Sequence, residues 1–250
     1  MSDASTILIT GCSSGFGLDT ARLFLDRGWR VIATMRTPRE DLLPASGRLR
    51  VLALDVTDPL GIRRCLDETG PIDALVNNAG IGLAAPLEGL AQTSIREVVE
   101  TNLLGTIAMT QAVLAPMRER GSGVVVNVTS TVTLRPLPLL SVYTASKAAV
   151  NAFTESLALE LEPFGVRLRL VLPGRCLDTR FGDNARRLMA DQPPAAYVEF
   201  QRRVFESIRD TSTPLTESAA VAQAVWHAVT DPRAPMRIPA GADAVAMATA

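Results

Sequence analysis

Residues 6–17 read Thr-Ile-Leu-Ile-Thr-Gly-Cys-Ser-Ser-Gly-Phe-Gly, an apolar run followed at once by a glycine-rich turn. The run has the length and composition of a buried β-strand, and residues 16–27 continue in a helical pattern. Glycines at 11, 15 and 17 let the backbone turn tightly and approach a pyrophosphate, which the N-terminus of the following helix would attract. The stretch therefore predicts a strand–loop–helix unit that binds a dinucleotide. The alternative is a tight turn without a ligand. The loop residues expected at the dinucleotide are Gly11, Ser13, Ser14, Gly15, Phe16 and Gly17.

Short apolar runs alternate with helical patterns along the rest of the chain. The further candidate strands are 30–34, 50–54, 74–76, 123–128 and 167–172, with a weaker last one at 236–239. The helix-like stretches lie near 59–67, 92–119, 141–162 and 217–230. Such alternation predicts an α/β fold with a Rossmann-type, doubly wound parallel sheet of about seven strands.

Residues typical of helix ends agree with this division. Gly28, Gly121 and Gly165 stand just past three proposed helices, where a left-handed cap residue is common. Ser141 is placed to cap the helix over 141–162. We expect a single domain over 1–250. The polar, arginine-rich stretch 182–213 is the least regular part, and it is interpreted as an inserted substrate lid or helix pair, with a plain surface excursion as the alternative.

Composition excludes several classes of function. The chain has 250 residues, is 47% hydrophobic and carries a net charge of −1, so nucleic acid and anionic membrane surfaces are not expected partners. There is no run of ~18 apolar residues to suggest a membrane span. Residues 1–5 do not resemble a signal peptide, and a cytoplasmic protein is expected. Cys12, Cys65 and Cys176 are interpreted as reduced thiols, and the single histidine, His227, as structural, so no metal is expected.

The end of the second strand indicates which dinucleotide binds. An NAD site usually places an acid there for the ribose 2′-hydroxyl, but this chain has Met35 followed by Arg36. An arginine can pair with a 2′-phosphate, so NADP(H) is the predicted cofactor. The alternative is that Arg36 is a solvated loop residue. Asp55 is a candidate acceptor for the adenine amino group, with Val56 beside it, and a turn aspartate is the alternative.

Tyr143 and Lys147 stand four residues apart in a predicted helix. A phenol has an unperturbed pKa near ~10, and a neighbouring cation on the same helix face favours the phenolate. Such a pair predicts acid–base chemistry at a carbonyl group. A solvated pair on a helix surface is the alternative for this spacing taken alone.

Taken together, the motifs resemble those of the short-chain dehydrogenase/reductase family over nearly the whole chain, in its NADP-preferring carbonyl reductase or hydroxysteroid dehydrogenase-like branch. The matching segments are Thr10-Gly-x-x-x-Gly-x-Gly17, Asn77-Asn-Ala-Gly80, Asn102, Ser130 thirteen residues before Tyr143, Tyr143-x-x-x-Lys147 and Pro173-Gly174.

The resemblance implies roles for these residues. Ser130 would hold the substrate oxygen, Tyr143 would transfer the proton, and Lys147 would lower the pKa of Tyr143 and bind the nicotinamide ribose. Asn102 would hold a water molecule that relays protons towards Lys147. Alternatively, its side chain would satisfy backbone hydrogen-bonding groups within a helix. Asn78 is expected to tie adjacent strands together. Further cofactor contacts are implied for Asn78, Ala79, Gly80, Pro173 and Gly174.

The chain departs from the family pattern after Pro173-Gly174. A threonine often follows five residues after that proline, whereas this chain has Asp178 and then Thr179. The resemblance assigns the contact with the nicotinamide carboxamide to Thr179. Arg175 and Cys176 replace small or apolar residues often found there.

The loop 131–140 is mostly apolar and favours a lipophilic ketone or secondary alcohol as substrate. Residues 83–86 are candidates for the same wall, and Arg135 for an acidic substrate group or a surface role. Family resemblance suggests a homodimer or homotetramer through the helices near 100–119 and 141–162. The small residues Ala145, Ala148, Ala149 and Ala152 either serve that interface or face the sheet.

Two functions of other classes compete with a ketone/alcohol oxidoreductase. A non-catalytic NADP(H)-binding redox sensor on this fold would tend to lose the Tyr–Lys pair, which this chain keeps. A nucleotide-sugar epimerase or dehydratase would be longer, with an added substrate domain.

Overall fold

A computed structural model describes residues 4–177, 188, 193–212 and 214–249. The described residues form a parallel sheet of seven strands in the order β3-β2-β1-β4-β5-β6-β7. The strands are β1 Thr6–Thr10, β2 Arg30–Met35, β3 Leu49–Ala53, β4 Ala74–Asn77, β5 Gly123–Val128, β6 Val166–Pro173 and β7 Arg237–Ala240. The predicted fold class and all seven strands are confirmed, and no strand end differs from its prediction by more than one residue.

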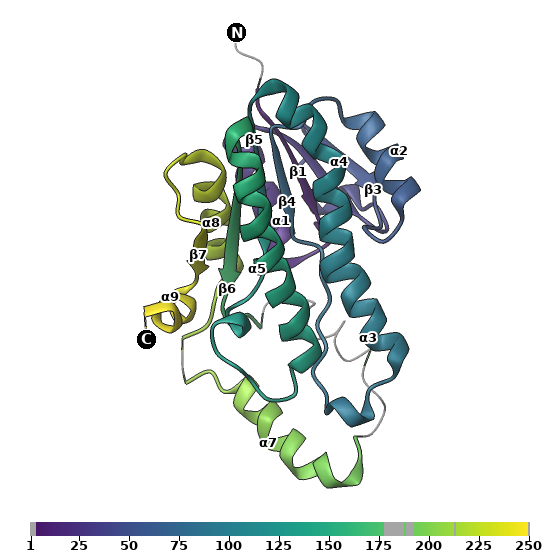
Figure 1. The fold of residues 1–250 in the computed structure, drawn as a ribbon, viewed down its shortest axis with the longest axis vertical. Coiled ribbons are helices and arrows are strands. Elements are labelled where there is room, and N and C mark those ends of the chain that lie inside the picture. Colours follow the sequence, from purple (N-terminus) through teal and green to yellow (C-terminus); the bar gives the residue numbers. More distant parts are fainter. Residues whose placement is uncertain (1–3, 178–187, 189–192, 213, 250) are drawn as a thin grey trace.

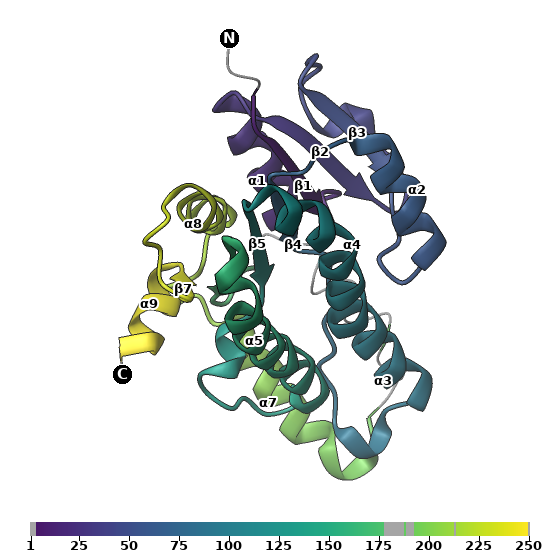
Figure 2. The same cartoon turned by 45° about the horizontal axis from the view of Figure 1, so that its top comes forward.

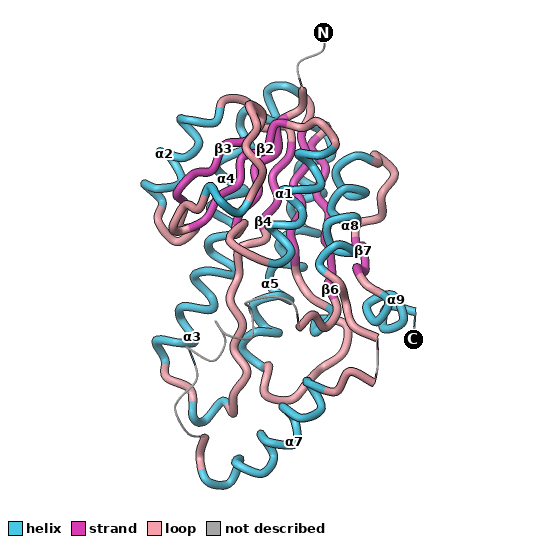
Figure 3. Tube along the Cα trace, turned by 180° about the vertical axis from the view of Figure 1, so that it is seen from behind, coloured by secondary structure: helices cyan, strands magenta, loops and turns pink. Residues whose placement is uncertain are grey.

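Helices cover both faces of the sheet (Figures 1 and 3). The helices α1 Gly15–Asp26 and α8 Ser218–Thr230 pack on one face. The other face is covered by α2 Pro59–Thr69, α4 Gly105–Arg120 and α5 Ser141–Leu161, and Figure 2 shows α4 and α5 side by side. The helix α3 Gln92–Val99 continues through a π-helical turn, Glu100–Leu104, into α4.

Two further helices lie outside these layers. The helix α9 Ala242–Thr249 follows β7, where the sequence pattern predicted none. The helix α7 Val198–Arg209 lies within the predicted insertion and beyond the ends of α3 and α5 (Figures 1 and 2). The described part of the insertion is thus helical rather than a plain loop.

The helix caps agree with prediction except at Ser141. Gly28, Gly121 and Gly165 have φ values of +85°, +64° and +68°, the left-handed region that glycine enters without a steric penalty. Ser141 is not the N-cap, because the carbonyl of Leu140 already accepts a helical hydrogen bond from the Thr144 N–H at 2.7 Å. Ser141 is therefore the first helical residue, and its side chain is exposed.

The alanines of α5 face outward. Ala145, Ala148 and Ala152 are exposed and Ala149 is half-buried, so the alternative that this stripe faces the sheet is wrong for three of the four. The side chains of α5 that do turn inward include Val150, Thr154 and Leu161.

The continuous helix Gln92–Arg120 has 29 residues and a mean hydropathy of 1.3 in its most apolar window, of which 39% is buried. By length and composition it could span a membrane, so the expectation that no such segment exists is wrong. Met109, Val113 and Met117 of this helix pack with Leu75 and Val125 of the sheet. Core helices pass the same test, so length and composition alone do not identify a membrane segment here.

Candidate functional site

A cavity of about 1560 Å³ runs along the carboxyl ends of the parallel strands. Nucleotides bind at this edge of doubly wound sheets, where the strand order reverses, here between β1 and β4. The cavity is lined by most of the residues predicted to bind a dinucleotide: Gly11, Ser13, Ser14, Gly15, Phe16, Arg36, Asp55, Val56, Asn78, Ala79, Gly80, Tyr143, Lys147, Pro173 and Gly174. Gly17 and Asn102 lie behind this lining, and Thr179 lies outside the described residues.

The glycine loop is shaped for close approach of its backbone. Gly11 has φ +75°, and a Cβ there would lie 2.9 Å from the Cα of Ala79. A Cβ on Gly17 would lie 2.5 Å from both the carbonyl oxygen of Gly11 and the side-chain nitrogen of Asn78. At the N-terminus of α1, Ser14 makes no side-chain cap, and the first turn carries no acidic residue. The amides and positive dipole end of α1 are thus suited to an anionic phosphate.

The predicted tie between strands is present at Asn78. Its side-chain nitrogen donates to the carbonyl oxygens of Thr10, at 2.9 Å, and Gly11, at 3.2 Å. The hydroxyl of Thr10 completes the tie by accepting from the N–H groups of Asn78 and Ala79, both at 3.0 Å. These bonds hold the loop after β4 against the end of β1, and sequence analysis did not single out the Thr10 hydroxyl.

We expect Thr10→Val to destabilise the protein by roughly 2–4 kcal/mol, because two amide groups lose their acceptor in a site that a methyl group fills. For a chain of this size the melting temperature would fall by roughly 5–10 °C. The matched control is Thr34→Val, since the buried Thr34 hydroxyl only donates to the Ile9 carbonyl oxygen, at 3.1 Å. Thermal unfolding that showed equal losses for the two variants would contradict this account.

The residues at the ends of β2 and β3 lie at one end of the cavity. Met35 and Arg36 both line it, and the Arg36 side chain is exposed. Asp55 lines it too, while its Oδ1 accepts from the Thr57 N–H at 3.0 Å and the Thr57 hydroxyl at 2.7 Å. Asp55 therefore both stabilises its own turn and lines the cavity.

Ser130, Tyr143 and Lys147 converge on the cavity wall from two elements. Ser130 lies in the loop after β5, and the other two lie one turn apart on α5. All three are buried, Tyr143 is hydrogen-bonded to Ser130, and the Lys147 ammonium donates to the Val128 carbonyl oxygen at 2.9 Å. The Lys147 nitrogen lies 6.0 Å from the centre of the Tyr143 ring.

Burial sets the pKa values of this pair. It raises the pKa of Tyr143 above the ordinary value of 10, and the hydrogen bond with Ser130 opposes that shift. Burial also lowers the pKa of Lys147 to about 8. The pKa of Tyr143 in this structure is therefore raised rather than lowered, with burial as the largest cause. The lowering of this pKa by Lys147 stays a prediction. At neutral pH a Lys147 with this pKa is still mostly protonated.

Asn102 is fully buried in the π-helical turn. Its amide nitrogen donates to the Ile81 carbonyl oxygen at 2.9 Å and the Ser146 hydroxyl at 3.0 Å, and its oxygen accepts from the Ile81 N–H at 2.8 Å. The side chain thus satisfies backbone groups, although of the loop after β4 rather than of its own helix. A Cβ on Gly80 would lie 3.2 Å from the Asn102 oxygen and 3.4 Å from the Lys147 nitrogen, so both residues flank Gly80. The relaying water stays a prediction.

Two residues that sequence analysis missed hold the Pro173-Gly174 segment. The Thr216 hydroxyl accepts from the Gly174 N–H at 3.1 Å and lies 2.6 Å from a carboxylate oxygen of Asp243. The other Asp243 oxygen accepts from the Arg175 N–H at 2.7 Å. A Cβ on Gly174 would collide with this carboxylate, which explains the glycine. No sequence signal links positions so far apart along the chain.

The remaining walls are mostly apolar. From the predicted loop 131–140, the cavity is lined by Thr131, Val132, Leu134, Arg135, Leu137 and Leu140. Of the candidates at 83–86, only Ala84 lines it: Leu83 packs in a separate buried cluster, and the buried Ala85 bonds through its N–H to the Leu139 carbonyl oxygen. Other elements add Leu177, Phe205, Ile208, Ala246 and Met247.

The other singled-out side chains lie apart from this chemistry. His227 is half-exposed on α8, 3.7 Å from Asp231, and does not line the cavity. Within the described part of the chain, no group of His, Cys, Asp and Glu could hold a metal ion. None of the three cysteines forms a disulfide. Burial raises the pKa of the Cys12 thiol to about 12, which makes it a poor nucleophile. Cys176 lines the cavity.

Comparison with known proteins agrees with the site. The family model described as short chain dehydrogenase matches residues 5–189. The 3-ketodihydrosphingosine reductase of Bacteroides thetaiotaomicron is 38% identical over 71% of this chain and 66% of its own length. Human retinol dehydrogenase 8 is 34% identical over 93% of this chain and 80% of its own length.

A solved structure of the closed form of serine dehydrogenase complexed with NADP+ superposes with a TM-score of 0.81 at 29% identity, covering 93% of each chain. The chain spans just under two thirds of the length of the bacterial reductase. The family match and the identities above 30% nevertheless suffice to conclude that this chain belongs to the short chain dehydrogenase family and is an oxidoreductase.

Proposed function

We propose that the protein uses NADP(H) to interconvert a lipophilic ketone and the corresponding secondary alcohol. The observation that carries this is the convergence of Ser130, Tyr143 and Lys147 on a cavity that the glycine loop also lines. One cavity therefore presents a phosphate-binding turn, an acid–base side chain and an apolar wall. We also propose a cytoplasmic location, and a homodimer or homotetramer that uses the exposed alanines of α5.

The residues present fit a dinucleotide. The φ of Gly11 and the crowding at Gly17 leave backbone rather than side chains at the loop surface, and the N-terminus of α1 is not blocked by an acidic side chain. Arg36 would hold a 2′-phosphate, and Asp55 would accept from the adenine amino group. The bound cofactor supplies or takes the hydride, while the protein supplies geometry and electrostatics.

The acid–base work falls to the side chains of the cavity wall. Ser130 and Tyr143 would hydrogen-bond the substrate oxygen, and Tyr143 would donate its proton to that oxygen in reduction and remove it in oxidation. A raised pKa keeps Tyr143 protonated, the form that reduction requires. The charge of Lys147, only one helical turn away, would stabilise the phenolate after the proton leaves. Water would be excluded by the apolar loop 131–140.

A lipophilic substrate is supported by two observations. The cavity that Tyr143 lines is also lined by the apolar side chains of Leu134, Leu137, Leu140, Phe205 and Met247. The two relatives are named for 3-ketodihydrosphingosine and retinol, which are both predominantly apolar molecules. We expect NADPH oxidation with hydrophobic ketones and little with sugars. NADPH binding without turnover of any ketone would favour the non-catalytic redox sensor.

The cofactor choice is tested by titrating protein fluorescence with NADPH and NADH. We expect tighter binding of NADPH, and a loss of roughly 10–100-fold in NADPH affinity for Arg36→Ala, since a charge-assisted contact contributes roughly 1.5–3 kcal/mol. NADH affinity should stay unchanged. Arg39→Ala is the matched control, because Arg39 pairs with Asp41 at 2.6 Å and does not line the cavity. A preference for NADH in the wild-type protein would refute the assignment of Arg36.

A further inference from the structure

The side chain of Arg175 caps the C-terminus of α7. Its guanidinium donates to the carbonyl oxygens of Ser207, at 2.9 Å, Ile208, at 3.2 Å, and Asp210, at 2.5 Å. The last carbonyls of a helix have no partner within the helix and carry the negative end of its dipole. A planar group with several fixed donors is well matched to such a cluster of acceptors.

The backbone of the same residue is anchored elsewhere. Its N–H donates to the Asp243 carboxylate at 2.7 Å, and its carbonyl oxygen accepts from the Thr216 N–H at 2.7 Å. Arg175 follows directly on Pro173-Gly174, and all three residues line the cavity. Arg175 thus joins the segment expected beneath the nicotinamide to a helix that lines the same cavity.

The helix that Arg175 caps has few other anchors among the described residues. None of the side chains of α7 is buried, and Figure 1 shows the helix standing clear of the sheet. Yet Phe205, Ser207, Ile208 and Arg209 of α7 all line the cavity. The position of that wall therefore depends on how the end of α7 is held.

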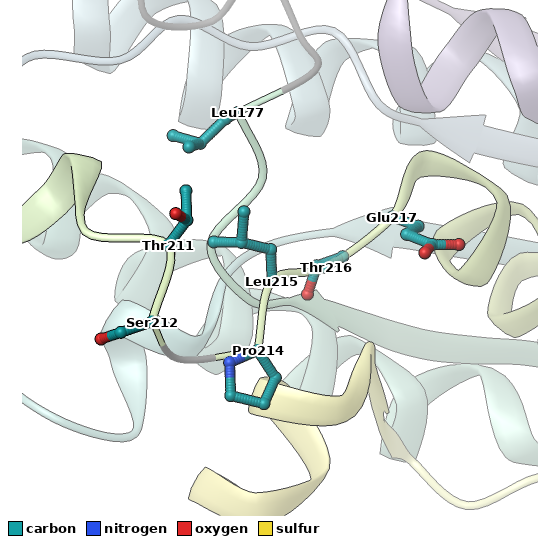
Figure 4. Close-up of a pocket in the computed structure, with 7 residues that line it drawn as sticks. All are labelled: Leu177, Thr211, Ser212, Pro214, Leu215, Thr216 and Glu217. Atoms are coloured by element: carbon teal, nitrogen blue, oxygen red, sulfur yellow. The ribbon is translucent and has the colours of Figure 1, made fainter.

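Described residues that follow α7 border a second pocket. Its volume is about 440 Å³, and Leu177, Thr211 and Leu215 converge on it (Figure 4). The Asp210 carboxylate is occupied with its own turn, where it accepts from the Ser212 N–H and hydroxyl, both at 2.9 Å.

We propose that Arg175 is a positioning residue for substrate binding, which transmits the position of the Pro173-Gly174 segment to the α7 wall of the cavity. The inference rests on the proposed function only in taking that cavity as the substrate site. A cofactor that orders residues 173–175 would then order the end of α7 as well, through the Arg175 cap.

Amide hydrogen exchange over 198–209 tests this directly, in wild type, Arg175→Met and Arg175→Lys, each with and without NADPH. Without NADPH, we expect α7 to exchange about tenfold faster in Arg175→Met, since charge-assisted bonds are lost. NADPH should slow exchange of α7 in wild type and leave it unchanged in Arg175→Met, while NADPH affinity stays within about twofold. Arg175→Lys keeps the charge but fewer donors, and should fall between them.

Arg203→Met is the matched control, because Arg203 is an exposed α7 arginine, 3.9 Å from Glu199, that does not line the cavity. With a ketone substrate, Arg175→Met should raise KM about tenfold and change kcat by less than about threefold. The proposal would be overturned if α7 exchanged at the wild-type rate in Arg175→Met. It would also be overturned if NADPH did not change the exchange rate of α7 in the wild type.

The exchange measurement without ligand requires no activity, so it separates failure of the positioning role from failure of the proposed function. If circular dichroism shows that Arg175→Met does not fold, the same exchange and KM measurements are made on Arg175→Lys and compared with the wild type.

Discussion

Tyr143→Phe should lower kcat by roughly 10²–10⁴-fold, the range that a positioned acid or base contributes. The phenylalanine ring keeps the apolar contacts of the buried tyrosine and removes only the hydroxyl that bonds Ser130 and would transfer the proton. NADPH affinity should stay within about twofold, because the change leaves the glycine loop and Arg36 untouched. Turnover at saturating ketone and NADPH, with a separate NADPH titration, provides both values.

Tyr197→Phe is the matched control, since Tyr197 is the second of only two tyrosines and lies outside the cavity. It should retain the turnover of the wild type. Near-normal turnover in Tyr143→Phe would remove Tyr143 from the mechanism. Loss of turnover together with loss of NADPH binding would instead indicate a disturbed cofactor site.

The second large effect is the titration of Lys147, the only lysine in the sequence. Burial lowers its pKa from 10.5 to about 8. Protein labelled with ¹³C at the lysine side chain should therefore give one lysine signal, whose chemical shift changes with a midpoint near pH 8. A midpoint near 10.5 would show that the ammonium group is solvated and would contradict its burial.

The same shift makes stability depend on pH. Below about pH 8 the lysine is protonated in both states, and the cost of burying the charge is fully present. Between about pH 8 and 10.5 the unfolded chain binds the proton and the folded chain does not, so stability rises with pH. Tyr143 has the opposite sign above pH 10, because its raised pKa keeps the proton on the folded chain.

Lys147→Met should therefore raise the free energy of unfolding at pH 7, by roughly 2–3 kcal/mol, and this advantage should shrink as pH rises to 9.5. Thermal unfolding of the two proteins over that range measures it. A difference between them that does not change with pH would contradict the linkage.

Local patterns were sufficient to predict the seven strands, but they missed the helix α9. The runs 6–10 and 123–128 are apolar enough to be buried on both sides, and their ends match β1 and β5. Gly121 and Gly165 have the left-handed backbone conformation with which the preceding helices end. The prediction at Ser141 was wrong because a one-residue shift in the first helical hydrogen bond places a capping hydroxyl inside the helix.

The residues that line the site could be predicted from the sequence, but the residues that hold them in place could not. The glycine loop, Ser130, Tyr143 and Lys147 lie at one cavity, as their motifs indicate. Thr216 and Asp243 carry no motif, and they reach Gly174 and Arg175 only because β7 pairs with β6. The alanines of α5 could not be oriented from spacing alone, since several faces of that helix carry small residues.

By itself the sequence determined the order of the strands and of the helices that cover the sheet, the glycine turns and the Tyr–Lys spacing, because each depends on residues a few positions apart. Tertiary structure alone decided that Arg175 caps α7, that Asp243 holds the Pro173-Gly174 segment, and that burial raises the pKa of Tyr143. The physical reason is that desolvation and long-range hydrogen bonds exist only after distant segments have closed over one another.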